Sequence, residues 1–348
     1  MASRPGRGTP PTACGFLSIS VRFIRRRACA TCPRHAIINH VPSGMCERGV
    51  SMQTSHPSTI STGQAHLLAL GTILVWGTTF IASTVALRTL SPVELLLFRL
   101  VIALVALFLV NRQKLKIKQR KHELYLLGAA LSGVVLYFLF ENIALTYTSS
   151  ANCSVIVSTA PFFVAMASRA FVRDERLPRS FFLGFVVAIA GVALVSFAGQ
   201  SLQLNPLGDG LSLLAAVAWA LYSVFIRKLE GHGYNTLLLT RRIFAYALVL
   251  MIPVTLVMGF SVTPQDVFNP ETLLNVLFLG IVASALGFVT WNTAVRTLGA
   301  IKTSAYIYLI PAVTILFAWL LLHDPIHPLS IVGAGLTLLG LFISQRRR

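Results

Sequence analysis

Charged residues are scarce in this sequence, and their scarcity excludes an ordinary soluble fold. Asp, Glu, Lys and Arg together make up 11% of the 348 residues, whereas an average soluble chain carries about 25%. Hydrophobic residues make up 55% of the chain, and the mean hydropathy is +0.75. We therefore expect a membrane protein.

Acidic residues are the rarer charged type, with 11 against 29 basic residues, so the formal net charge is +18. In a soluble domain this excess would suggest a nucleic-acid partner. Here the basic residues lie in short patches between apolar segments, so they do not form a folded basic surface. We expect no nucleic-acid partner.

The apolar segments also lack the residue types that catalysis and metal binding require. The histidines fall in the first residues of the chain, in loops or at helix edges: His35, His40, His56, His66, His122, His232, His323 and His327. No catalytic base or zinc-ligand set is visible inside the bilayer. We expect no catalytic residue, no metal and no cofactor.

The cysteine pattern and the lack of a phosphate-binding loop argue against two further features, a disulfide framework and ATP-driven transport. Four of the five cysteines lie in the first fifty residues and Cys153 stands alone, so no disulfide framework is implied. No Gly-Lys-Ser/Thr loop occurs, which argues against ATP-driven transport. An intramembrane enzyme and a sensor or partner subunit remain as alternatives to transport.

Long apolar runs are what the sequence does contain. A bilayer core of about 30 Å requires about 20 apolar residues in a helix. Ten such stretches follow one another: Leu67–Leu87, Val93–Val110, Leu124–Thr146, Ser150–Phe171, Phe181–Ala198, Leu211–Ile226, Leu237–Met258, Leu273–Ala294, Thr303–Leu322 and Leu329–Ile343. The alternation of a membrane barrel is absent, so we predict an all-α integral membrane protein.

Lys and Arg are concentrated in alternate loops, which predicts the orientation of the chain. Six follow the second stretch, four follow the fourth, two follow each of the sixth and eighth, and three end the chain, whereas the other loops contain Arg88 alone. Both termini are therefore expected in the cytoplasm. Residues 1–65 are expected to form a disordered basic tail, with Met45 or Met52 as an alternative start, and residues 344–348 a basic cytoplasmic C-terminus.

The chain also repeats itself. A shift of 150 residues lays "ENIALTYTSSANCSVIVSTAP" over "WNTAVRTLGAIKTSAYIYLIP", and a shift of 143 pairs Trp76 with Trp219 and Arg99 with Arg242. We predict five-helix repeats at 67–198 and 209–343. Because five is odd, the second copy is expected to be inverted in the membrane, with a substrate site near the midplane between the copies.

Several segments resemble the EamA-type members of the drug/metabolite transporter superfamily. They are "LVWGTTF", "ENIALTYTSSA", "RDERLPRSFFLGFVVAIAGVALV" and their second-half counterparts. The resemblance implies ten helices in two units and a secondary transporter of small metabolites, amino acids or drugs that works by alternating access. It also implies a cavity lined by helices 1 to 4 and 6 to 9. The second half departs from the pattern at "HDPIH", where the first has the acidic turn Asp174-Glu175.

Glu141 is the leading candidate site residue, because an ionised group at the bilayer centre costs at least about 2.5 kcal/mol. It is interpreted as a proton or substrate-amine site, or as a structural partner of Arg99. Arg99 and Arg242 could hold a carboxylate of the substrate. Alternatively, both arginines anchor their helices at the membrane interface.

The remaining candidates are aromatic, amide and proline residues. Trp76, Thr79, Trp219, Tyr222 and Trp291 are interpreted as an aromatic cavity wall or as packing. Asn142 and Asn292 are expected to form hydrogen bonds between helices or to contact substrate. Pro161 and Pro311 are expected to interrupt helices 4 and 9 near their middles and to act in gating, or to be inherited bends. Tyr308 shares the Pro311 face.

These observations lead to one functional expectation. We expect a transporter in the plasma membrane, here a bacterial inner membrane, driven by a gradient or by exchange. Its partners would be a small-molecule substrate and membrane lipids, and a homodimer is compatible with this expectation.

Overall fold

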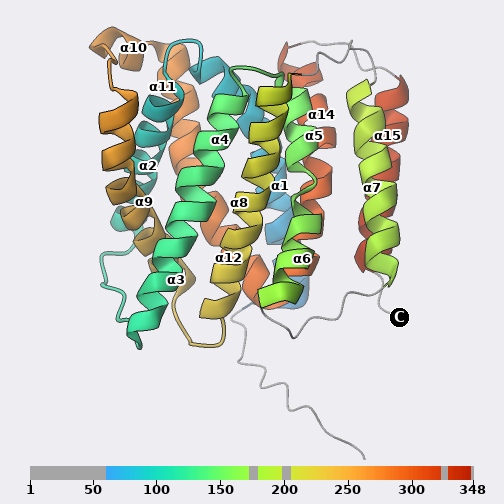
Figure 1. Ribbon diagram of the computed structural model, residues 1–348, viewed down its shortest axis with the longest axis horizontal. Helices are drawn as coiled ribbons and strands as arrows, with labels where there is room; N and C mark the ends of the chain where they lie inside the picture. Colours follow the sequence, from blue (N-terminus) through green and yellow to red (C-terminus); the bar gives the residue numbers. More distant parts are fainter. Residues whose placement is uncertain (1–59, 172–178, 198–204, 323–327, 346–348) are drawn as a thin grey trace, which may run out of the picture. The chain divides into compact units, whose positions relative to one another are not determined.

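The computed structural model describes residues 60–171, 179–197, 205–322 and 328–345 (Figure 1). Every regular element in these residues is a helix, which confirms the all-α prediction. Most of the tail that was predicted to be disordered, residues 1–59, lies outside the described residues, as do residues 346–348 of the C-terminus.

The first half of the described chain, residues 60–197, contains seven α-helices and one π-helical segment. They are α1 (Thr62–Ala86), α2 (Pro92–Val110), α3 (Arg120–Ala130), η1 (Leu131–Leu136), α4 (Tyr137–Ala144), α5 (Ser150–Val157), α6 (Ala160–Phe171) and α7 (Arg179–Phe197). The segments α3, η1 and α4 follow one another without a break, and α5 and α6 form an interrupted helix.

The second half, residues 205–345, repeats this order with one extra short helix. Its elements are α8 (Pro206–Leu229), α9 (Thr236–Met258), α10 (Pro264–Phe268), α11 (Pro270–Leu277), η2 (Phe278–Leu286), α12 (Gly287–Leu298), α13 (Ala300–Ser304), η3 (Ala305–Leu309), α14 (Ile310–Leu322) and α15 (Pro328–Gln345). Here α11, η2 and α12 are continuous, as are α13, η3 and α14.

Eight helices in the described part of the chain are long and apolar enough to cross a membrane. The fifth and tenth apolar stretches form shorter apolar helices, within α7 and α15. A multi-pass membrane protein is thus confirmed. The full arrangement of ten spans in two inverted repeats stays a prediction.

Polar residues at the helix starts explain why the second span begins at Pro92. The Ser91 side chain accepts a hydrogen bond from the Glu94 N–H, while the Glu94 carboxylate accepts one from the Ser91 N–H at 2.8 Å. This capping box satisfies backbone donors that the first turn leaves free. The second Glu94 oxygen accepts from the Ser261 N–H at 2.8 Å. Glu94 is thus a buried carboxylate with a structural role.

The third helix of each half contains a π-helical turn at matching positions. The 150-residue shift carries η1 onto residues 281–286, which lie within η2. Glycines accompany both turns and allow close helix contacts. A Cβ on Gly133 would lie 2.2 Å from the Tyr222 ring, and one on Gly280 would lie 2.6 Å from Ile102. Such π-turns are frequent at functional sites.

Pro161 and Pro311 lie where their helices change geometry. Pro161 is the second residue of α6, just after the interruption at Ser158 and Thr159, and Pro311 is the second residue of α14, just after the 3₁₀ segment η3. Because α6 begins after an interruption, Pro161 lies in a first turn, where N–H groups have no intrahelical partner, so proline there sacrifices no backbone bond. Pro311 lies within the continuous run from α13 to α14, where proline lacks the N–H that another residue would donate to the preceding turn. A gating role stays a prediction.

The two halves pack against each other because the first helix of each half lies against helices of the other half (Figure 1). Helix α1 lies antiparallel to α11–α12, with hydroxyl contacts at Thr89–Thr272 (2.8 Å) and Thr72–Thr290 (2.7 Å). Helix α8 lies antiparallel to α3–α4 in the same way, because its late residues contact α3 and its early residues contact the end of α4. The first helix of each half therefore packs on the third helix of the other.

Basic residues collect at one end of these helices, which we call the basic face and which lies at the lower edge of Figure 1. Lys228 lies 5.5 Å from the Tyr125 ring and 5.9 Å from the Phe171 ring, so the ends of α8, α3 and α6 meet there. Acidic side chains mark the opposite ends, at Glu94, Asp209, Asp266 and Glu271. This distribution agrees with the loop charges. The orientation of the termini stays a prediction.

We predict that a single methyl group at Gly340 destabilises the antiparallel contact of α7 with α15. A Cβ there would lie 2.4 Å from the backbone nitrogen of Ala188, and overpacking of this kind costs about 1–3 kcal/mol. Gly335 on the same helix is the control, because nothing lies within 4 Å of the point that its Cβ would occupy. Gly340→Ala should lower the melting temperature of the purified protein in detergent and Gly335→Ala should not. Equal shifts would contradict the packing described.

Candidate functional site

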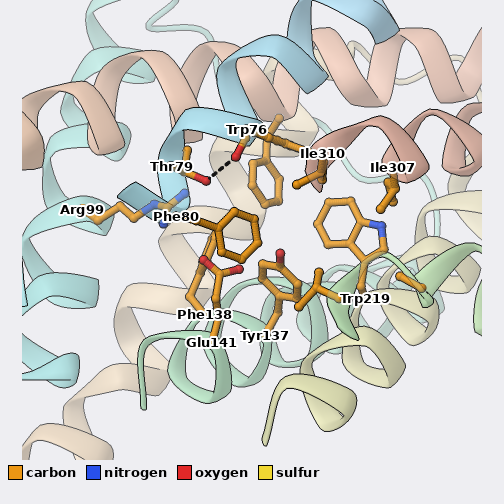
Figure 2. Close-up of a pocket in the computed structure, with 13 residues that line it drawn as sticks. Trp76, Thr79, Phe80, Arg99, Tyr137, Phe138, Glu141, Trp219, Ile307 and Ile310 are labelled. Carbon is orange, nitrogen blue, oxygen red and sulfur yellow. Dashed lines mark hydrogen bonds between the residues drawn. The ribbon is translucent and has the colours of Figure 1, made fainter. Parts of the chain in front are cut away.

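A small cavity of about 20 Å³ lies where the two halves meet (Figure 2). Most of its lining residues come from the first half and the others from the second half. In this conformation it has room for about one water molecule. The lining comprises Trp76, Thr79, Phe80, Arg99, Tyr137, Phe138, Glu141, Val157, Ala160, Trp219, Phe288, Ile307 and Ile310. We call it the central cavity.

Glu141 extends from α4 into the central cavity (Figure 2). Its side chain is almost fully buried, with 2% of the residue exposed. Tyr137 lies one helical turn earlier, so both side chains share a face of α4. The Tyr137 hydroxyl points toward the Glu141 carboxylate (Figure 2). A carboxylate and a hydroxyl thus form one polar corner of an otherwise apolar cavity.

Arg99 extends into the cavity from α2 and is 1% exposed. Its Nε donates a hydrogen bond to the Ser284 hydroxyl at 2.6 Å, where α2 packs on η2. Its guanidinium carbon lies 3.8 Å from the centre of the Phe138 ring, a cation–π contact. No described residue forms a hydrogen bond with its Nη1 group. Ser284 and the Phe138 ring therefore hold the guanidinium of Arg99 in place, and its Nη1 group can still donate a hydrogen bond.

Arg99 and Glu141 line the same cavity without a direct ion pair. Between described residues, the ion pairs within 4.0 Å are Arg227–Glu230 and Arg242–Glu123. The direct structural pairing that the sequence left open is therefore not formed. The two residues nevertheless face the same cavity, Arg99 from α2 and Glu141 from α4.

Trp76 and Trp219, which the 143-residue shift pairs, meet in the aromatic wall of the cavity. Their ring centroids are 5.2 Å apart in an edge-to-face contact, and Trp291 packs behind Trp76 at 4.9 Å. The Trp76 Nε1 donates to the carbonyl of Ala283 at 3.0 Å, whereas the buried Trp219 Nε1 has no hydrogen-bond partner in the part of the chain that the structure describes. The structure thus brings the two repeat-related rings together at the cavity.

The other predicted residues lie outside the central cavity. Asn142 donates to the carbonyl of Pro92 at 3.3 Å, and Asn292 accepts from the Tyr222 hydroxyl at 2.8 Å. Tyr308 is buried, and its hydroxyl has no hydrogen-bond partner within residues 60–171, 179–197, 205–322 and 328–345. Arg242 forms an ion pair with Glu123 at the basic face, whereas Arg99 lines the central cavity.

Sequence reasoning missed Tyr137, Phe138, Ser284 and Phe288. Two signals could have found three of them. Tyr137 stands four residues before Glu141, and Phe138 and Phe288 are matched by the 150-residue shift. Nothing in the sequence pointed to Ser284, because its partnership with Arg99 depends on the packing of α2 against η2.

Among known protein families, one matches both halves of this chain. A family model described as the EamA-like transporter family matches it twice, over residues 63–197 and 206–345. The chain belongs to the EamA-like transporter family. It is accordingly a small-molecule transporter, and the resemblance noted in its motifs is confirmed.

Named relatives of this EamA family member are also transporters. An "Uncharacterized transporter" of Archaeoglobus fulgidus is 30% identical, over 82% of this chain and 98% of the relative. A "Probable amino-acid metabolite efflux pump" of Salmonella typhimurium is 29% identical, over 80% and 93%. A "Probable terminal-alkyne amino-acid exporter" of Streptantibioticus cattleyicolor is 27% identical, over 79% and 91%.

A solved crystal structure shares the fold of this family member. It superposes with a TM-score of 0.66 and covers 82% of this chain and 97% of its own. The sequence identity is 19%, so the likeness concerns the fold alone.

We predict that the two repeat-related tryptophans differ in what their indole nitrogen contributes. Trp76→Phe removes the hydrogen bond to the Ala283 carbonyl, and a hydrogen bond of this kind contributes about 0.5–1.5 kcal/mol. Trp219→Phe removes a nitrogen that has no hydrogen-bond partner among the described residues. Both changes shrink the side chain equally, so Trp76→Phe should give the larger drop in melting temperature. The reverse order would contradict the hydrogen bonding described.

Proposed function

We propose that this EamA family member is a secondary active transporter of zwitterionic, amino-acid-like metabolites. The observation that carries the proposal is the pair of opposite charges, Arg99 and Glu141, that share one buried cavity without touching. A substrate with a carboxylate and an ammonium group would complement both.

The separation of the two charges has an energetic cost. A buried charge is expensive unless it is paired and hydrogen-bonded, and removing its partner leaves the cost uncompensated. Two flexible side chains of opposite charge in one cavity would be expected to close into an ion pair. Arg99 is held back by Ser284 and by the Phe138 ring. The arrangement therefore favours a ligand that bridges the two charges.

The two ends of the cavity suit the two ends of a zwitterion. The unpartnered Nη1 of Arg99 can donate to a carboxylate, and a guanidinium suits that group because its donors form a planar fork. The Glu141 carboxylate, with the Tyr137 hydroxyl beside it, can accept from an ammonium group. Between them, Trp76, Trp219 and their neighbours offer an apolar surface for a side chain.

The relatives support the amino-acid class in particular. The proteins from Salmonella typhimurium and Streptantibioticus cattleyicolor carry names that refer to amino-acid metabolites and to a terminal-alkyne amino acid. We extend that class to this chain because its central cavity offers complementary charges. Chemistry on the substrate is not part of the proposal, so we assign no enzymatic activity.

The proposed mechanism is alternating access between two inverted five-helix repeats, at 67–198 and 209–343. The exchanged packing of α1 on α11–α12 and of α8 on α3–α4 supports this arrangement. Pro161 and Pro311 lie at helix breaks where the halves could bend. A gradient or exchange would supply the energy.

We further propose that the basic face is cytoplasmic, since positively charged loops are retained on that side. Both termini would then lie in the cytoplasm, and the membrane would be the plasma membrane, here a bacterial inner membrane. Lipids and the substrate are the proposed partners. A homodimer is compatible with this arrangement, and no nucleic-acid partner is proposed.

We predict that binding depends on both charges of the ligand and on both charges of the protein. Phenylalanine, phenethylamine and 3-phenylpropionate share an aromatic ring, but the second lacks the carboxylate and the third lacks the amine. Because charged hydrogen bonds contribute about 1.5–3 kcal/mol, the purified protein should bind phenylalanine about tenfold to a hundredfold more tightly than either analogue. Titration calorimetry measures these affinities.

Variants connect each ligand group to one residue. Arg99→Met should remove the preference for phenylalanine over phenethylamine, and Glu141→Gln should remove its preference over 3-phenylpropionate. Each variant should keep the preference that the other loses. If both preferences survive in both variants, the assignment of the two charges is wrong.

We predict that Glu141→Gln also abolishes transport. The substitution retains the shape of the side chain but removes the charge from the central cavity, so phenylalanine uptake into proteoliposomes should fall at least about tenfold. Glu271→Gln is the matched control, because Glu271 is an exposed carboxylate at the start of α11. Equal uptake by Glu141→Gln and the unaltered protein would overturn the proposed role.

A further inference from the structure

A second cavity lies on the basic-face side of the protein and is not used by the proposed binding site. Its volume is about 30 Å³, and it is lined by the end of α8, the following loop, the start of α9 and the end of α12, including Gly231, Gly233, Tyr234, Thr236, Asn292 and Arg296. Gly231 and Gly233 adopt positive φ angles of 76° and 71°, which shape this loop. We call it the basic-face cavity.

Polar groups distinguish this cavity from a packing void. Arg296 donates a hydrogen bond from Nη1 to the Tyr234 carbonyl at 3.0 Å, which ties the end of α12 to the loop. The side chains of Thr236 and Asn292 add a hydroxyl and an amide to the lining. A cavity of this size with such a lining can hold water.

Tyr222 separates this cavity from the central cavity. Its ring lies 5.0 Å from Trp219 and 5.8 Å from Phe288, measured between centroids, and both of these residues line the central cavity. Its hydroxyl donates to the Asn292 amide oxygen at 2.8 Å, and Asn292 lines the basic-face cavity. The two cavities thus lie on either side of one layer of side chains.

Asn292 continues this layer to a third helix. Its amide nitrogen donates to the Thr240 hydroxyl at 3.3 Å, so the chain of hydrogen bonds joins α8, α12 and α9. Tyr222 and Thr240 are almost completely buried. We call the Tyr222–Asn292–Thr240 chain the partition. Both of its bonds run between side chains of different helices, so a relative movement of those helices breaks them without unwinding any helix.

The matching positions in the first half do not form such a chain. The shifts of 143 and 150 residues carry Tyr222 and Asn292 back to Thr79 and Asn142. Thr79 donates to its own helix, at the carbonyl of Trp76, and the buried amide oxygen of Asn142 accepts no hydrogen bond from any described residue. The partition is therefore specific to the side of the protein that faces the basic loops.

We propose that the basic-face cavity is a vestibule for the transported substrate and that the partition is the barrier between this vestibule and the central cavity. Opening the partition would join the two cavities into one path toward the basic face. The role of a vestibule rests on the proposed transport function. The barrier between the two cavities can be measured without a substrate.

Cysteine accessibility tests the proposal directly. The five native cysteines are replaced by alanine in the full chain. One cysteine is then introduced at Thr236 in the vestibule or at Thr79 in the central cavity. Membrane vesicles that expose the basic face are treated with a charged, membrane-impermeant methanethiosulfonate, and the rate of labelling is measured.

We expect Thr236→Cys to react quickly and Thr79→Cys to react slowly in the otherwise unaltered protein. Tyr222→Phe and Thr240→Val each remove one hydroxyl of the partition while they preserve side-chain shape. Because one buried hydrogen bond contributes about 0.5–1.5 kcal/mol, each should raise the labelling rate at Thr79→Cys about two- to tenfold. Tyr246→Phe removes a hydroxyl that contacts Glu123 instead and should leave the rate unchanged.

Two results would overturn the proposal. If Thr236→Cys does not react, the basic-face cavity is not open to that face. If neither Tyr222→Phe nor Thr240→Val changes labelling at Thr79→Cys, the partition is not the barrier. Neither readout involves a substrate, so failure here differs from failure of the ligand-binding measurements, which would overturn the proposed function instead.

Discussion

The close approach of α1 and α8 to the third helix of the opposite half is the constraint on which the rest of the structure depends. A Cβ on Gly133 would lie 2.2 Å from the Tyr222 ring, and one on Gly287 would lie 2.8 Å from the Trp76 Nε1. Any side chain larger than hydrogen would push these helices apart. Since both glycines adjoin or belong to a π-helical turn, the contact combines unusual backbone geometry with small residues.

This exchanged packing determines what lines the central cavity. Because each first helix packs on the other half, Trp76 and Trp219 meet in one wall although 143 positions separate them. The same arrangement places α2 against η2, so Ser284 can hold Arg99 beside Phe138 and apart from Glu141. The separation of charge that supports zwitterion binding is thus a consequence of helix packing.

The two halves are similar in sequence but not equivalent in detail. Arg99 is buried in the cavity, whereas Arg242 pairs with Glu123 at the basic face. Asn292 bridges three helices, whereas its counterpart Asn142 bonds to the carbonyl of Pro92. The related positions of the two halves therefore contact different partners, so sequence similarity between the halves does not make their side-chain environments equivalent.

Composition and apolar runs determined the helical membrane fold, because lipid leaves the backbone few alternatives to the helix. They also predicted most of the spans and singled out Glu141, since a lone carboxylate in an apolar run is conspicuous.

Only the tertiary structure decided which residues share a cavity. It separated Arg99 from Arg242 and placed Tyr222 and Asn292 between two cavities. The physical reason is that side-chain partners are fixed by how helices rotate and approach one another. That geometry depends on glycines, π-turns and contacts between distant segments, none of which leaves a periodic signal in the sequence.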